Sequence, residues 1–432
     1  MRLETKYPME LREIDAKTHM LFMTGHKKEH YMQTDVWGEV KSDNGWSHEF
    51  AGMYDGDRLV ASIMMLKKKL PGFPRYLFYA PRGPVADFDE REQIRDLTQL
   101  LRGYIRQRRG IYLAIDPDVC YRVCDSRGNE IRPKDDFVEF MQSLGWRHQG
   151  FPMNFEGRQP RFTFRLPLQD GAQAVFDGFD RMAKKNIGIS EESCIQVEAR
   201  DDLTGFFALM EDTAQRDHFY EGSRAYYERL YPMLRDAGMA ELTYARYLPK
   251  LHYAQIDGQI SALDAEIAEN ENRMREKNMP KLATRNKQLL QKRKRIEKQR
   301  ATAAQYMQSH PDGLDLSALI CIHTKNRFWT VYGGNSSELR QTSANYAITW
   351  QAIRKAADAG MEFLDFFGST GDPSPDNPVT GIYAFKKKFS GNFVEFPGEF
   401  HLVVRPGLYA LWEKFSPAAL RVMRKIKRKL NR

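Results

Sequence analysis

The sequence is poor in cysteine and has no long apolar run. Its 432 residues include four cysteines, Cys120, Cys124, Cys194 and Cys321. Four are too few for a disulfide framework, and they fit a reducing compartment. The N-terminus lacks the apolar core of a signal peptide, and nowhere do about eighteen apolar residues follow one another. We therefore expect a cytoplasmic protein without a membrane span.

Several catalytic signatures are also missing. Cys120 and Cys124 have no second His/Cys pair nearby, so we predict ordinary thiols and no metal site. The chain has no Gly-x-Ser-x-Gly motif and no cysteine–histidine signature of a nucleophile. It also lacks the Arg/Gln-x-x-Gly-x-Gly/Ala loop by which acetyltransferases hold the pyrophosphate of coenzyme A. A coenzyme-A-dependent acetyltransferase is therefore disfavoured.

Positive charge is concentrated in two segments. The formal charge of the chain is +9, but residues 256–300 carry a net +5 and residues 421–432 a net +7, which leaves −3 for the rest. The body is slightly acidic, so the sequence predicts two local contacts with polyanions.

Alternating strand and helix patterns predict an α/β protein of two domains, residues 1–150 and 151–410. In the first domain we expect strands over 59–66 and 110–116 and helices over 90–108 and 137–144. In the second we expect a strand over 161–167 and helices over 172–185 and 202–216. The recurring order suggests duplication of one α/β unit.

Residues 251–308 interrupt the second domain with a different rhythm. Ile256, Ile260, Leu263, Ile267, Asn270 and Met274 follow the a/d spacing of a coiled coil, and Leu282, Leu289, Ile296 and Ala303 recur every seven residues. Pro280 lies between the two runs and cannot continue a helix interior. The first limb is mainly acidic and the second basic. We predict an antiparallel helical hairpin about 35 Å long, inserted between neighbouring strands.

The most distinctive order of motifs runs from Trp329 to Phe400. A strand ends at Gly333-Gly334, a helical run covers 346–356, and a second strand ends in Asp365-Phe-Phe-Gly368. Then come Gly381-Ile-Tyr-Ala-Phe-Lys-Lys-Lys-Phe389 and Pro397-Gly-Glu-Phe400. This order resembles the FemABX family, which builds peptidoglycan cross-bridges.

The resemblance implies two tandem acetyltransferase-like (GNAT-like) domains with an inserted antiparallel coiled-coil arm. It also implies aminoacyl transfer from aminoacyl-tRNA, a co-substrate needing no further cofactor, to a stem-peptide amine. The acceptor would be lipid II or a UDP-MurNAc-pentapeptide. Such a reaction needs no nucleophile from the protein, but it needs two aligned substrates, a proton acceptor and a partner for the oxyanion.

The resemblance also implies substrate-binding residues in two segments. Trp37 and Lys41 match the family's N-terminal element, where a lysine meets the nucleotide or pyrophosphate. A second segment, in which the family grips the precursor's sugar and phosphates, supplies Arg216, Tyr220, Arg224 and Tyr227. Tyr332, beside the Gly333-Gly334 pair, is a further candidate. The alternative is that these are ordinary surface and helix-end residues.

Two candidates for the chemistry itself stand out. Asp116 ends the strand over 111–115 and would act as a base or orient the amine; the alternative is a simple Asp-Pro turn. Lys386, Lys387 and Lys388 lie between Phe385 and Phe389, and alternation predicts that one or two of them point into a cleft. There a lysine would stabilise negative charge, whereas a solvated charge run is the alternative.

Other partners and a competing function remain open. The basic tail, residues 411–432, predicts peripheral contact with the anionic inner face of the membrane if Val422, Ile426 and Leu430 form a helical stripe. The arm would serve tRNA or a homodimer. A protein that binds nucleic acid through the basic hairpin without transferase activity is the competing function, although no RNA-recognition motif is present.

Overall fold

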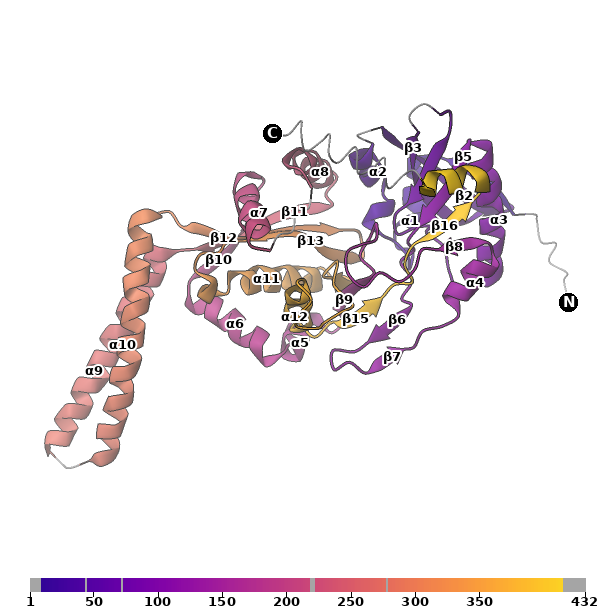
Figure 1. The fold of residues 1–432 in the computed structure, drawn as a ribbon. Helices are drawn as coiled ribbons and strands as arrows, with labels where there is room; N and C mark the ends of the chain where they lie inside the picture. Colours follow the sequence, from indigo (N-terminus) through magenta and orange to yellow (C-terminus); the bar gives the residue numbers. More distant parts are fainter. Residues whose placement is uncertain (1–8, 43–44, 71–72, 218–221, 277–278, 415–432) are drawn as a thin grey trace.

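The computed structural model describes residues 9–42, 45–70, 73–217, 222–276 and 279–414. Their strands form two mixed sheets side by side, and a rod of two helices projects from one end (Figure 1). The α/β fold class predicted from the sequence is thus confirmed. None of the described helices combines the length and the apolar character needed to cross a bilayer.

The first sheet has seven strands in the order β1-β2-β3-β4-β5-β16-β8, of which β4 and β5 run parallel. Side chains alternate along each strand. On β3, Ile63 and Met65 therefore join the core of α3 and α4, while Met64 and Leu66 join the core of α2. The elements are β1 (Glu10–Ile14), β2 (Trp46–Asp55), β3 (Arg58–Lys69), β4 (Tyr76–Ala80), β5 (Gly110–Ile115), β8 (Trp146–His148), β16 (Phe400–Val403), α1 (Ala16–Met23), α2 (Asp35–Lys41), α3 (Arg91–Gln107) and α4 (Phe137–Ser143).

The second sheet has nine strands in the order β10-β11-β12-β13-β14-β9-β15-β6-β7, of which β13 and β14 run parallel. Helices α7 and α8 cover one face, and α5, α6 and α11 the other (Figure 1). The elements are β6 (Arg122–Cys124), β7 (Glu130–Arg132), β9 (Phe162–Pro167), β10 (Ile195–Ala199), β11 (Ala240–Tyr247), β12 (Leu314–His323), β13 (Arg327–Asn335), β14 (Phe363–Asp365), β15 (Asn392–Glu395), α5 (Gly171–Gly178), α6 (Arg181–Glu192), α7 (Thr204–Asp217), α8 (Arg224–Asp236), α11 (Ala344–Asp358) and α12 (Thr380–Lys387).

The two sheets exchange strands across the predicted boundary at residue 150. Strand β16, from the end of the predicted second domain, lies between β5 and β8 of the first sheet. Strands β6 and β7, from the predicted first domain, extend the second sheet beyond β15. One buried aromatic cluster also joins both halves, with Trp37 from one side and Tyr227, Trp329 and Tyr332 from the other. The halves therefore share a core.

Helices α9 (Pro249–Glu276) and α10 (Pro280–Ser309) pack against each other and interrupt the antiparallel pair β11 and β12. They project away from the body (Figure 1). Most of the predicted a/d residues are buried between them, whereas Met274 and Leu282 are half-buried. Asn270, which is also buried, donates to Asn286 at 2.8 Å. A buried Asn pair fixes the register of a coiled coil. The ion pairs Arg285–Glu266, Arg293–Asp264 and Arg300–Asp257 join the limbs, as their opposite charges predicted.

Candidate functional site

A cleft of about 550 Å³ lies beside the parallel strands β13 and β14. The two strands pair only over Arg327–Trp329 and Phe363–Asp365, whereas β13 continues to Asn335. The part of β13 beyond Trp329, which pairs with β12 but not with β14, forms one wall, and the end of α7, the segment 366–368 and α12 form others. Because β13 pairs with β14 only as far as Trp329, a ligand can approach the backbone of β13 beyond that point.

Three cations, Arg216, Arg340 and Lys386, line this cleft. Arg216 lies near the end of α7 and donates to the carbonyl oxygen of Asn335 at 3.1 Å. A Cβ on Gly334 would lie 2.7 Å from the backbone of Leu209. Gly334 therefore lets α7 pack closely on β13 and so helps to place Arg216.

The three adjacent lysines lie at the end of helix α12, with Lys386 and Lys387 in the helix and Lys388 as its C-cap. Their segment forms and caps α12, where successive residues point about 100° apart. Lys386 Nζ donates to the carbonyl oxygens of Phe367 (2.6 Å) and Gly368 (2.5 Å) at the wall of the cleft. Lys387 and Lys388 line a separate pocket of about 570 Å³. Of the three lysines, Lys386 is thus the one that lines the large cleft.

A second group of polar side chains joins α2 to the other half of the molecule. Lys41 Nζ donates to Tyr226 Oη at 2.7 Å, and the Tyr226 and Tyr332 hydroxyls lie 3.1 Å apart. The Lys41 ammonium also lies 4.5 Å from the ring centre of Trp37, which is buried. The structure therefore brings Lys41 and Tyr332 together as candidates, with Trp37 as a support beneath the lysine.

The other residues of the predicted second segment are spread out. Tyr227 is buried, with its ring 5.1 Å from that of Tyr332. Arg224 is exposed at the start of α8 and pairs with Glu228. Tyr220 lies outside the described residues. It is Tyr226, not Tyr227, that contacts Lys41, because adjacent helical residues face different directions.

Asp116 ends β5, as the sequence predicted, and is buried. Its Oδ2 accepts from the Tyr79 hydroxyl at 2.6 Å, and its Oδ1 accepts from the backbone N–H of Arg82 at 2.7 Å. Burial raises the pKa of Asp116 to about 6, against the smaller lowering effects of Arg82 and Tyr79. A carboxyl group titrating near neutrality is suited to proton transfer.

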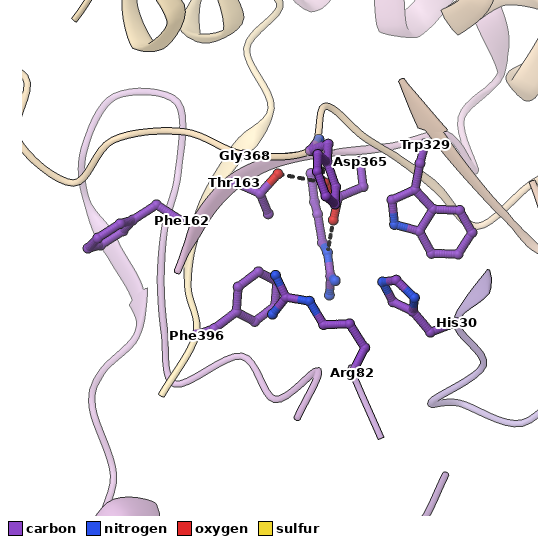
Figure 2. A pocket seen from close by; sticks show the side chains of 10 residues that line it. His30, Arg82, Phe162, Thr163, Trp329, Asp365, Gly368 and Phe396 are labelled. Carbon is purple, nitrogen blue, oxygen red and sulfur yellow. Dashed lines mark hydrogen bonds and ion pairs between the residues drawn. The ribbon is translucent and has the colours of Figure 1, made fainter. Parts of the chain in front are cut away.

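A small enclosed pocket lies at the seam between the halves (Figure 2). His30 and Arg82 reach it from the first half and Trp329 and Asp365 from the second. The segment Phe367–Gly368 lines both this pocket and the large cleft. Since Arg82 also binds Asp116, a short chain of contacts connects Asp116 to the cleft.

Sequence reasoning missed the partners of these residues. Tyr79 and Arg82 hold Asp116, yet each lies more than thirty positions away in the chain. Residue spacing within a segment cannot predict which distant segment will contact the end of a strand. The Tyr226-Tyr227 pair was visible, but helical phase alone left open which tyrosine faces Lys41.

Comparisons with known proteins match this chain over almost its full length. A profile of the FemAB family matches residues 14–416. The lipid II:glycine glycyltransferase of Staphylococcus haemolyticus is 26% identical over 98% of this chain and 99% of its own length. The enzyme of the same name from Staphylococcus aureus (strain USA300) is 28% identical, over 98% and 100%. The crystal structure of FemX superposes with a TM-score of 0.78 at 26% identity, covering 93% of this chain and 99% of that one.

Proposed function

Because the chain belongs to the FemAB family, we propose that it transfers an amino acid from aminoacyl-tRNA to the stem-peptide amine of a lipid II-type peptidoglycan precursor. The product would be part of the interpeptide bridge. The names of the relatives support a lipid-linked acceptor and glycine as the amino acid. The observation that carries the proposal is the large cleft lined by Arg216 and Lys386, with Asp116 connected to it across the seam.

We assign the cleft to the aminoacyl end of the donor, and Arg216 with it, whereas the resemblance assigned Arg216 to the precursor. The 3′ end of a tRNA carries phosphates and an ester, and cations beside a partly enclosed cleft neutralise such charge. The Lys41, Tyr226 and Tyr332 group is assigned to the acceptor, because an ammonium and two hydroxyls bind phosphate and sugar oxygens.

The reaction is aminolysis of an ester. The acceptor amine attacks the ester carbonyl, a C–N bond forms, and the C–O bond to the ribose breaks. Asp116 accepts the proton that the amine loses and returns it to the departing ribose oxygen. Lys386 stabilises the negative charge on the carbonyl oxygen in the tetrahedral intermediate.

The direct test is an assay with purified protein, charged tRNA and a lipid-linked muramyl-pentapeptide. A panel of aminoacyl-tRNAs identifies the amino acid, and we expect transfer from glycyl-tRNA. A parallel arm with acetyl coenzyme A tests the competing acetyltransferase reaction. Failure of every charged tRNA to label the precursor would contradict the proposal.

The arm is proposed to contact tRNA. Six cations of α10 are exposed, and within the described chain no ion pair involves them: Lys281, Lys287, Lys292, Lys294, Arg295 and Lys298. We expect a chain in which a short Gly/Ser link replaces residues 256–305 to stay folded, because β11 and β12 still pair. Its tRNA binding should weaken less steeply with salt than that of the intact chain. If tRNA binding by the two chains weakens equally with salt, the arm would act in homodimerisation instead. Sedimentation of the intact chain would check this.

Most of the predicted basic tail, residues 415–432, lies outside the described residues. We propose that it attaches the enzyme to the anionic face of the membrane that holds the precursor, at about 1 kcal/mol per basic residue. The measurement is sedimentation with anionic liposomes, and a chain ending at Pro417 should pellet less than the full chain. Equal recovery at physiological salt would exclude the tail as an anchor.

A further inference from the structure

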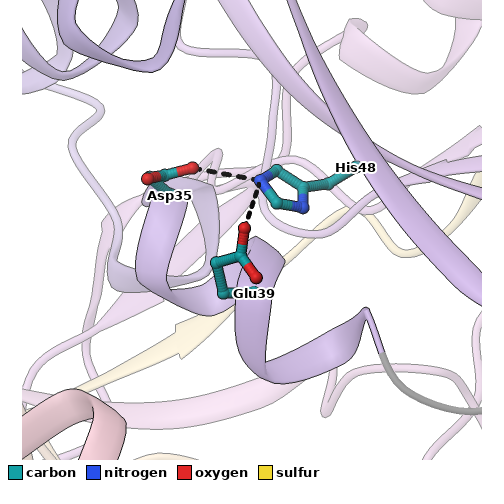
Figure 3. A group of neighbouring side chains, drawn as sticks. All are labelled: Asp35, Glu39 and His48. Atoms are coloured by element: carbon teal, nitrogen blue, oxygen red, sulfur yellow. Dashed lines mark hydrogen bonds and ion pairs between the residues drawn. The ribbon is translucent and has the colours of Figure 1, made fainter.

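Three side chains away from the cleft converge on a single point. Asp35 and Glu39 lie one turn apart on α2, and His48 reaches them from β2 (Figure 3). His48 Nε2 lies 3.0 Å from Asp35 Oδ1 and 3.9 Å from Glu39 Oε1. The imidazole is 12% exposed, whereas both carboxylates reach solvent. The result is a shallow site of one nitrogen and two oxygens.

The hydrogen-bond partner of His48 Nδ1 determines whether Nε2 of the same ring carries a proton or a lone pair. Ser42 Oγ donates its one proton to the carbonyl oxygen of Gly38 at 2.8 Å. The same hydroxyl oxygen lies 2.9 Å from His48 Nδ1 and can accept from the ring while it donates to Gly38. In that arrangement Nδ1 carries the ring proton, and the Nε2 lone pair points at two carboxylates. A metal ion bound between these three acceptors would satisfy all of them.

We propose that Asp35, Glu39 and His48 bind a divalent transition-metal ion of the zinc class. The three ligand atoms lie within 4.8 Å of one another. In a tetrahedral zinc site with bonds of about 2.0–2.1 Å, neighbouring ligand atoms are about 3.3 Å apart, and the observed 3.0 and 3.9 Å lie on either side of that spacing. One imidazole and two carboxylates favour Zn²⁺ or Mn²⁺ over Mg²⁺. Water would complete the coordination.

The local fold holds the histidine in place for this role. A Cβ on Gly38 would lie 2.6 Å from the His48 ring, so glycine at this position lets the ring lie directly on α2. Ser42 fixes the ring orientation from behind, as second partners of metal-binding histidines do. Thr34 caps the helix at Asp35 by accepting from the backbone N–H of Trp37. The spacing of the cysteines, from which no metal site was predicted, gives no indication of this group of residues.

The proposed site has a consequence for the other face of α2. This seven-residue helix also carries Trp37 and Lys41, and a metal ion bound to both α2 and β2 would limit its movement. The effect on Lys41 rests on the proposed function, whereas metal binding itself does not.

The test is titration calorimetry of the full chain, stripped with EDTA, using Zn²⁺, Mn²⁺ and Mg²⁺ separately. We expect one zinc site, with affinity roughly 100-fold lower in Glu39→Gln and in His48→Gln. Ser42→Ala should bind about tenfold more weakly, because the hydrogen bond that orients the His48 ring is lost. His310→Gln, at the end of α10, is the control for adventitious histidine binding and should match the wild type.

Wild-type affinity no higher than that of Glu39→Gln and His48→Gln would overturn the proposal. Glu39→Gln keeps the test valid if His48→Gln fails to fold, because Glu39 is exposed on its helix. Zinc binding without any aminoacyl transfer would reject the proposed function and keep the metal site. Aminoacyl transfer without zinc binding would reject the metal site and keep the proposed function.

Discussion

Replacing Lys386 with Met is expected to lower aminoacyl transfer by roughly 100-fold or more, the usual effect of losing one transition-state charge partner. Met keeps roughly the length of the side chain and removes the ammonium charge together with its hydrogen bonds. The ammonium is held at the wall of the cleft by the carbonyl oxygens of Phe367 and Gly368, so its position is fixed before the substrate arrives. The measurement is the single-turnover rate with saturating charged tRNA and precursor.

Two neighbouring substitutions are matched controls for that experiment. Lys387→Met and Lys388→Met remove the same charge from the same helix but on the side of the other pocket. We expect both variants to retain most of the transfer rate. Equal losses in all three variants would show that the helix carries a diffuse charge effect, and the assignment of Lys386 to the reacting ester would then be wrong.

The sequence predicted the elements whose periodicity is long. Helix α3 was placed within one residue at each end, and the heptads of the arm identified most of its buried residues. Asp116 was placed at a strand end because an apolar run stops there at an Asp-Pro break. In each case the pattern lies within the segment itself, so no distant contact was needed to read it.

The lysine segment shows where that reasoning stopped. The alternation of Phe385, Lys387 and Phe389 is typical of an extended chain, yet the segment begins as the helix α12. Phe389 is fully buried, and the ring of Phe385 packs 5.1 Å from that of Tyr346 on α11. These tertiary contacts decide the conformation of a helix that is too short for its own periodicity to do so.

The exchange of strands between the two sheets also could not be predicted from the sequence. Strands β6 and β16 have three and four residues, too few for a pattern to identify their partners. Their pairing depends on contacts between residues hundreds of positions apart, such as Phe400 with Ile115. The boundary predicted at residue 150 therefore does not separate the two sheets, because each sheet contains strands from the other side of it.

Asp116 is expected to make transfer depend on pH. Its pKa of about 6 means that the carboxylate, the form that accepts a proton, predominates above pH 6. The rate should therefore rise with pH through about 6 and then level off. The folded chain holds this proton more tightly than a free aspartate with a pKa of 3.8, so the contribution of Asp116 to stability falls as the pH rises from 3.8 to about 6.

Two variants separate a base from a turn residue at Asp116. Asp116→Asn keeps the shape, and we expect it to lower transfer by about 10²-fold or more and to abolish the inflection near pH 6. Tyr79→Phe removes the hydroxyl that donates to Asp116 Oδ2 and lowers its pKa, so the inflection should move to higher pH while the plateau rate is largely kept. Rates measured from pH 5 to 8 test both. An unchanged profile in Asp116→Asn would reduce the residue to its structural role, and in that case the Tyr79→Phe profile should be unchanged as well.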